Sequence, residues 1–148
     1  MSNWTHVAGI IRLDAYQPDC GEQDFDALIG KECPWDAPKE VWDEAYEHPE
    51  RFLPMGSEGS LQKTIWINPN KAETAAYTIS IFGDLRDSES AVDVVDWFRK
   101  LHDRLSRNEK IWGVRNAVIT ATNEWNGSAM WTQPDDDWVW QKDEPENN

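Results

Sequence analysis

Two aspartates close together in the sequence have side chains that could bind a metal ion. Asp84 and Asp87 lie on either side of Arg86, just after an expected strand that ends at Phe82. Carboxylates at the end of a strand can bind a divalent cation, which would activate water for hydrolysis. Asp87 also precedes Ser88, where a helix is expected to start. The alternative role of Asp87 is therefore to cap that helix, with no part in metal binding. A metal-dependent hydrolase is therefore one alternative.

Cysteine and histidine provide a second set of reactive side chains. Cys20, Cys33 and His48 have zinc-binding atoms, but their spacing matches no recognised metal motif, and two cysteines make no disulfide framework. His6 lies in no nucleophile or phosphate motif, and His102 falls on the apolar face of an expected helix, where a core position is the simpler interpretation. We therefore expect a protein that is not an enzyme and has no cofactor or metal.

Acidic and aromatic residues are better suited to binding. Trp138 and Trp140 alternate in an acidic segment, so a strand there would point both indoles to one side. Aromatic anchors supply affinity and surrounding acids steer the encounter. A segment that folds back on its own domain is the alternative. The candidate partner-binding residues are Asp36, Glu40, Asp43, Glu44, Glu47, Trp66, Asp135, Asp136, Asp137, Trp138 and Trp140.

The formal net charge of −14 is concentrated in two segments. Residues 15–60 contain 12 acids and 3 bases, a balance of −9, and residues 135–148 contain 6 acids and 1 base, a balance of −5. This pattern opposes direct contact with nucleic acid or an anionic membrane, because phosphate contacts need surplus bases. It favours a protein partner with a basic surface.

The length of 148 residues fits one domain. We divide it into an α+β domain over 1–134, with an acidic region at 15–60, and a tail over 135–148. No apolar run approaches the roughly 18 residues of a membrane span, and the N-terminus does not read as a signal peptide. We expect a cytoplasmic protein.

The clearest element in the sequence is an amphipathic helix that begins at Ser88. Its apolar residues recur at intervals of 3, 4, 3 and 4, which places them on one helical face. These residues are Ala91, Val94, Phe98, Leu101 and Leu105. The preceding strand is expected to end at Phe82, because residues 83–87 read as a break.

Alternation and turn residues predict the remaining elements. Strands are expected at 4–13, 61–68, 75–82 and 111–125, with a hairpin at Asn126-Gly127 leading to 128–132. Helices are expected at 24–29 and 38–46, the second capped by Asp36, and 56–60 reads as a flexible connector. The order β, α, β, β, α, β is that of the ferredoxin-like split βαβ fold, an antiparallel sheet with both helices on one face, here with a short C-terminal edge strand. We expect the 15–60 region or the tail to cover Trp66 and Phe82 on the other face, with a protein-binding surface as the alternative.

The sequence favours a small acidic binding protein that acts through protein–protein contact. A sharper hypothesis is a phage or mobile-element accessory protein, an inhibitor that mimics nucleic acid and covers a basic nucleic-acid-binding surface. The alternative is an oligomer that binds a nucleotide or metabolite. Its candidate residues are Trp66, Trp112, Arg12, Arg86 and Arg115.

Overall fold

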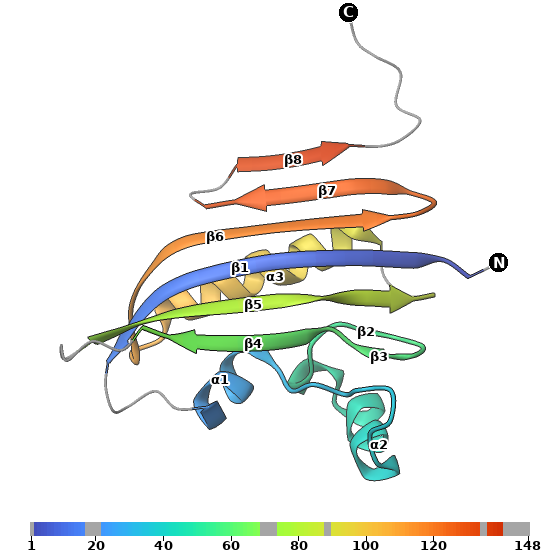
Figure 1. Cartoon of the computed structure of the whole chain (residues 1–148), viewed down its shortest axis with the longest axis horizontal. Coiled ribbons are helices and arrows are strands. Elements are labelled where there is room, and N and C mark those ends of the chain that lie inside the picture. The colour runs from blue at the N-terminus through green and yellow to red at the C-terminus, as the bar shows by residue number, and fades with distance from the viewer. Residues whose placement is uncertain (1, 17–21, 69–73, 88–89, 134–135, 141–148) are drawn as a thin grey trace, which may run out of the picture.

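The computed structural model describes residues 2–16, 22–68, 74–87, 90–133 and 136–140 (Figure 1). Its strands are β1 (Trp4–Tyr16), β2 (Met55–Gly56), β3 (Gly59–Ser60), β4 (Gln62–Ile67), β5 (Thr74–Arg86), β6 (Ile111–Asn123), β7 (Gly127–Thr132) and β8 (Asp136–Trp140). Its helices are α1 (Glu22–Ile29), α2 (Lys39–Glu47), the 3-10 helix η1 (Pro49–Arg51) and α3 (Ala91–Arg107). None of these helices is long and apolar enough to cross a membrane.

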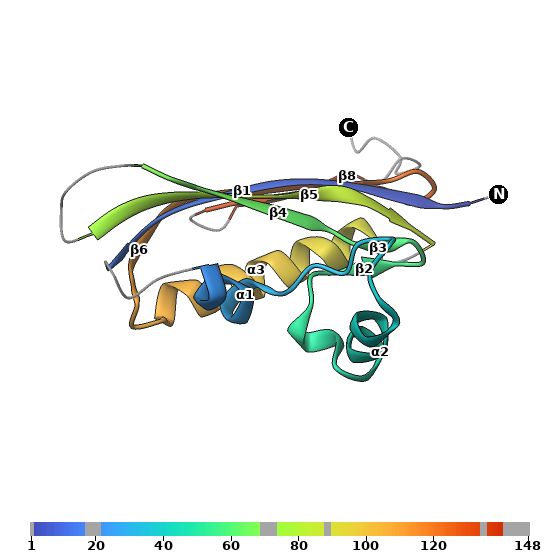
Figure 2. The same ribbon diagram turned by 60° about the horizontal axis from the view of Figure 1, so that its bottom comes forward.

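Six strands form one antiparallel sheet in the order β4-β5-β1-β6-β7-β8. The helices lie on one side of this sheet (Figure 2). The predicted α+β class with an antiparallel sheet is confirmed. The 128–132 strand is present as β7 but is not at the edge, because β8 pairs with it.

Helix α3 supplies most of the covering layer. Ser90 is its N-cap, with the side-chain oxygen accepting a hydrogen bond from the Asp93 backbone N–H at 3.3 Å. The predicted apolar face is confirmed, since all of its members are buried. Phe98 is fully buried and packs edge-on against Trp131, with ring centroids 5.9 Å apart. The helix begins at Ala91, three residues later than the sequence predicts.

Strand β5 does not end where the sequence predicts. It continues through the expected break to Arg86, and Gly83 pairs with Val7 of β1. Gly83 has a φ of 144°, which glycine adopts without the penalty of a Cβ, so the chain keeps its place in the ladder. Asp84 is therefore a strand residue opposite His6 and not part of a loop.

The expected flexible connector at 56–60 is instead a small hairpin of β2 and β3. The Ser57 N–H donates to the Arg86 carbonyl at 2.9 Å. A Cβ on Gly56 would lie 2.6 Å from the Arg86 nitrogen, so only glycine permits this close approach. The hairpin therefore attaches the acidic region firmly to β5.

Residues 33–55 form a projecting unit, called the acidic module below. Cys33, Ala45 and Phe52 are the centre of its own hydrophobic cluster. The module lies off the β4 side of the sheet, with α2 farther from the sheet than α1 and α3 (Figures 1 and 2). The proposed cap is wrong: Pro38 precedes α2, and no side chain caps it.

The shorter helix α1 covers the sheet where α2 does not. Its Phe25 is buried and packs against Tyr77 of β5, with ring centroids 5.2 Å apart. The helix predicted at 38–46 is therefore present but belongs to the module and not to the layer over the sheet.

Candidate protein-interaction surfaces

The acidic module exposes carboxylates over α2 and the segment before it. Asp36, Glu40, Asp43 and Glu47 are exposed, and Glu44 is partly buried. All of them come from one short stretch, because the apolar positions of α2 face the module's own cluster and leave the acids outside. The structure thus brings together the five acids that the sequence assigns to 36–47.

Only part of this negative charge is neutralised within the described residues. Lys31 pairs with Glu44 at 2.9 Å, and this hydrogen bond lowers the pKa of the Glu44 carboxyl. Lys39 lies 3.7 Å from Asp43. Asp36, Glu40 and Glu47 have no ion pair in the described part of the chain, so they are available to a basic partner.

Two aromatic side chains stand exposed among these acids. Trp35 is 71% exposed and Tyr46 is 74% exposed. Large aromatic side chains that remain in water are the usual anchors of protein interfaces. Sequence reasoning missed both residues. The signal was available for Tyr46, because it follows the inward-facing Ala45 on α2 and so points outward.

A groove of about 890 Å³ separates the module from α3. Its apolar walls include Tyr46, Phe52 and Trp97. Charged side chains line the α3 wall, namely Asp93, Asp96, Lys100 and Arg104. The groove therefore borders the exposed aromatic edge of the module and carries both signs of charge.

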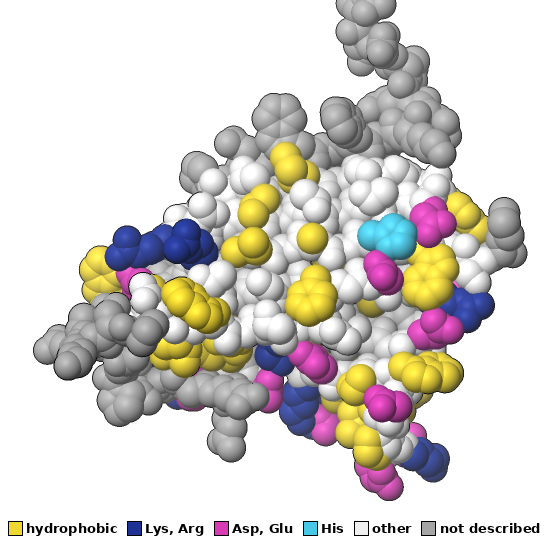
Figure 3. All heavy atoms as spheres, viewed as in Figure 1, with side chains coloured by type: hydrophobic (Ala, Val, Ile, Leu, Met, Phe, Trp, Pro, Cys, Tyr) yellow, Lys and Arg dark blue, Asp and Glu magenta, His cyan; other side chains and the backbone are white. Residues whose placement is uncertain are grey.

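The face of the sheet opposite α3 is called the open face below. Figure 3 shows apolar side chains near its middle, basic side chains toward one end, and the histidine beside acids toward the other. Ile10, Trp66 and Phe82 are 42%, 57% and 37% exposed. The expectation that the 15–60 region covers Trp66 and Phe82 is wrong for its described residues, because the module lies on the helix side of the sheet.

His6 lies between two carboxylates at one end of the open face. Its Nδ1 is 2.6 Å from Asp84 Oδ1, and its Nε2 is 3.1 Å from Glu124 Oε1. The hydrogen bond with Asp84 raises the pKa of His6, burial opposes the shift, and Glu124 adds to it. Carboxylates on both nitrogens favour the imidazolium, which has no free nitrogen with which to accept a proton.

Asp84 and Asp87, the two candidate metal ligands, bond to different partners in the structure. Asp84 bonds His6, whereas Asp87 accepts a hydrogen bond from the Asn3 backbone N–H at 2.8 Å and has a φ of 48°. Within the described residues, no group of three or more histidine, cysteine, aspartate or glutamate side chains could hold a metal ion. Cys33 is buried, which raises the pKa of its thiol, and Cys20 lies outside the described residues.

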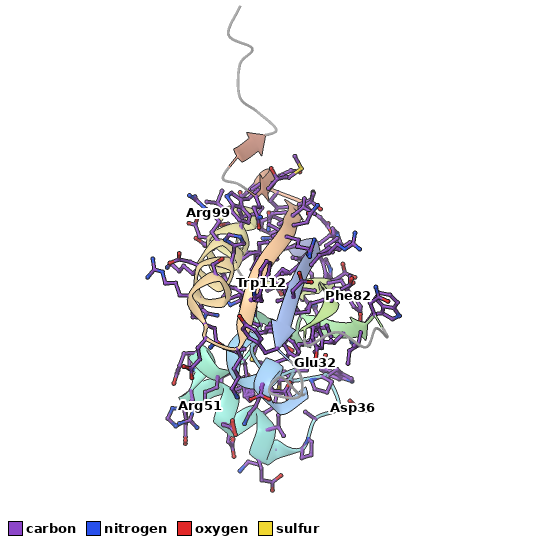
Figure 4. All side chains as sticks on the ribbon, turned by 90° about the vertical axis from the view of Figure 1, so that its left-hand side faces the viewer. Glu32, Asp36, Arg51, Phe82, Arg99 and Trp112 are labelled. Carbon is purple, nitrogen blue, oxygen red and sulfur yellow. The ribbon has the colours of Figure 1, made fainter. Side chains whose placement is uncertain are left out.

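The bases proposed for a small-molecule site are spread out and partly paired. Arg86 bonds Glu58 at 2.7 Å, and Arg115 bonds Asp14 at 2.6 Å. Arg12 is exposed on the open face without an ion pair in the described part of the chain. Figure 4 shows Phe82 pointing away from the α3 side of the sheet, whereas Arg99 lies on that side.

The remaining predicted partner-binding residues lie elsewhere. Trp66 is on β4, at one edge of the sheet, while Asp136, Asp137, Trp138 and Trp140 belong to β8 at the opposite edge. Asp135 lies outside the described residues. The predicted set therefore divides among three places in the molecule instead of forming one surface.

Comparisons with protein-family models, with curated proteins and with solved structures find no match. Function is therefore inferred from the geometry of these surfaces.

Proposed function

We propose that this is a non-catalytic binding protein that acts through protein–protein contact, with the acidic module as its binding surface. The observation that carries the proposal is the exposure of Trp35 and Tyr46 beside three carboxylates that have no ion pair within the described residues. The aromatics would anchor the partner, and the carboxylates would attract it. The module's own cluster and its attachment to β5 hold this surface in place before binding.

The partner that fits this surface has a basic face of the kind that binds nucleic acid. Carboxylates on a projecting unit can stand in for phosphates, and an excess of acid repels nucleic acid itself. The protein would then act as an inhibitor that covers such a face, as an accessory protein of a phage or mobile element does. Binding of this kind weakens as salt screens the charges.

The test is affinity capture from nuclease-treated lysate, washed at low and at high salt. We expect a basic nucleic-acid-binding protein to be retained at low salt and released at high salt. The retained protein, once purified, should lose its binding to nucleic acid when this chain is added. The combined variant Glu40→Gln, Asp43→Asn and Glu47→Gln should weaken this binding at least about tenfold, because each close interfacial charge contributes.

A matched control removes acids from another part of the molecule. Asp103 and Glu109 are exposed in and just after α3, and Asp103→Asn with Glu109→Gln should leave partner binding unchanged. An equal loss of partner binding in the module variant and in the control variant would show only a nonspecific effect of net charge. Unchanged binding in the module variant would refute the assignment of the surface.

Small-molecule binding is the second candidate, and the groove beside α3 is the observation in its favour. Trp97, Lys100 and Arg104 could bind an anionic aromatic ligand such as a nucleotide. A panel of nucleotides and metabolites should then raise the thermal midpoint. Lys100→Ala should reduce the shift, and Arg107→Ala, outside the groove lining, should not.

The ferredoxin-like arrangement is likewise a proposal. The order β4-β5-β1-β6 of the four strands supports it. The added strands β7 and β8 and the displacement of α2 from the sheet count against it.

A further inference from the structure

Among the described side chains, the open face has its charges at its two ends and almost none between them. The core-facing residues Gly9 of β1 and Ile81 of β5 pair with one another across the sheet. Counting from Gly9, His6 lies three residues to one side and Arg12 three residues to the other. His6 pairs with Asp84, so one end carries carboxylates and the other carries the Arg12 guanidinium.

The residues between these ends alternate in size about the same line. On β1, the small Ala8 lies on one side of Gly9 and the larger Ile10 on the other. On β5, Phe82 pairs with Ala8, and the small Ser80 pairs with Ile10. On these two strands, a large side chain on one side of the Gly9 line thus has a small one at the equivalent position on the other.

From this pattern we infer that the open face binds a second copy of this chain, in a symmetric dimer whose twofold axis runs across the strands over Gly9. Such an axis places each strand over its own copy, running in the opposite direction. Phe82 then meets the space beside the partner's Ser80, and Ile10 meets the partner's Ala8. Large residues facing small ones allow two sheets to interdigitate.

The charges favour a twofold axis across the strands over a twofold axis along the strands. A twofold axis along the strands would place each end of the open face over the same end of the partner, so that the two Arg12 ends meet and the two ends with Asp84 and Glu124 meet. The axis across the strands brings Arg12 of one copy to the His6 and Asp84 end of the other, twice per dimer. Opposite charges at both ends of a largely uncharged face fit a second copy despite the formal net charge of −14. The surface is distinct from the acidic module, so a dimer leaves the module free.

The test is sedimentation equilibrium of the whole chain over a wide concentration range, with two charge-reversed variants. Arg12→Glu should weaken the dimer at least about tenfold, because it places glutamate at the end of the partner that carries the Asp84 and Glu124 carboxylates. Asp84→Lys should do the same, because it puts a lysine in place of a carboxylate at the end that meets the partner's Arg12 end. Mixing the two variants should restore dimers at near wild-type affinity. In the mixed dimer, each end of one variant meets an end of opposite charge on the other variant.

The restored mixed dimer is the decisive result, because neither loss of folding nor a dimer with the other axis predicts it. Val92→Glu is the matched control: Val92 is 43% exposed on α3, away from the open face, and its substitution should leave dimerisation unchanged. Monomers at concentrations up to about 1 mM would overturn the inference. So would a dimer that both variants leave intact. None of these substitutions alters the acidic module, so partner capture by the module is scored separately.

Discussion

At the scale of single residues, His6 shows how neighbours from distant segments determine a side chain's charge. Its partners Asp84 and Glu124 are 78 and 118 residues away in sequence. They raise the pKa of His6 above its ordinary value of about 6.5. The protonated ring is therefore favoured in the folded state, so its contribution to stability is present below that value and is lost as pH rises through the folded pKa.

Asp84→Asn should lower the pKa of His6, because the hydrogen bond with Asp84 is the largest cause of the shift. The variant should also lose less stability than the wild type as pH rises above about 6.5. The measurement is an NMR titration of the His6 ring, together with urea unfolding at several pH values. Glu124→Gln should cause a smaller change. An unchanged His6 pKa in Asp84→Asn would contradict the assignment.

Gly59 is a second residue whose role depends on its surroundings. It has a φ of 122°, and a Cβ there would lie 2.8 Å from the Cys33 carbonyl oxygen. Gly59→Ala should reduce the unfolding free energy by about 1–3 kcal/mol, because alanine is strained at this φ and its Cβ would clash with the Cys33 carbonyl. Gly113→Ala is the control, since nothing lies within 4 Å of the added Cβ, and we expect a change within about 0.5 kcal/mol. Urea unfolding measures both, and equal losses would contradict the prediction.

At the scale of elements, α3 and β1 are fitted to each other. A Cβ on Gly9 of β1 would lie only 3.2 Å from the Phe98 ring of α3, so the glycine lets the aromatic ring approach the sheet closely. The buried Phe98 also meets Trp131 of β7. This helix therefore joins the middle of the sheet to its β7 side.

Phe98→Ala should reduce the unfolding free energy by about 3–5 kcal/mol, through lost burial and the cavity left behind. Val92→Ala, on the exposed part of the same helix, should change it by no more than about 0.5 kcal/mol. Denaturant unfolding followed by circular dichroism measures both changes. A small effect of Phe98→Ala would mean that α3 contributes less to the core than its burial indicates.

At the scale of the whole molecule, the formal net charge of −14 should make stability depend on salt. Like charges on the acidic module repel one another, and screening shortens their range from about 30 Å at 0.01 M salt to about 10 Å at 0.1 M. We expect the thermal midpoint to rise over this range. The rise should be smaller in the variant with Glu40→Gln, Asp43→Asn and Glu47→Gln. A midpoint that falls with salt would show that ion pairs outweigh the repulsion.

The local patterns could be predicted from neighbouring residues alone. The intervals of the α3 apolar residues and the alternation of β1 each depend on residues a few positions apart, and both predictions are confirmed. The hairpin after β6 is present, but its turn is at 124–126 and Gly127 already pairs with Asn123, so the predicted two-residue Asn126-Gly127 turn is wrong. The acidic surface of α2 could also be predicted, because its acids lie within one short stretch of the sequence. Gly83 misled the prediction of β5, since a glycine looks the same in sequence whether it ends a strand or continues it.

Which surfaces are exposed depends on how distant segments of the chain pack together. The module is attached to β5 through the β2–β3 hairpin and lies on the helix side of the sheet, and Trp66 and Phe82 are exposed on the other face. The register between β1 and β5 brings His6 to Asp84 and sets the charged ends of the open face. Such contacts join segments far apart in the chain, and their geometry depends on how whole elements pack, which no local spacing of residues encodes.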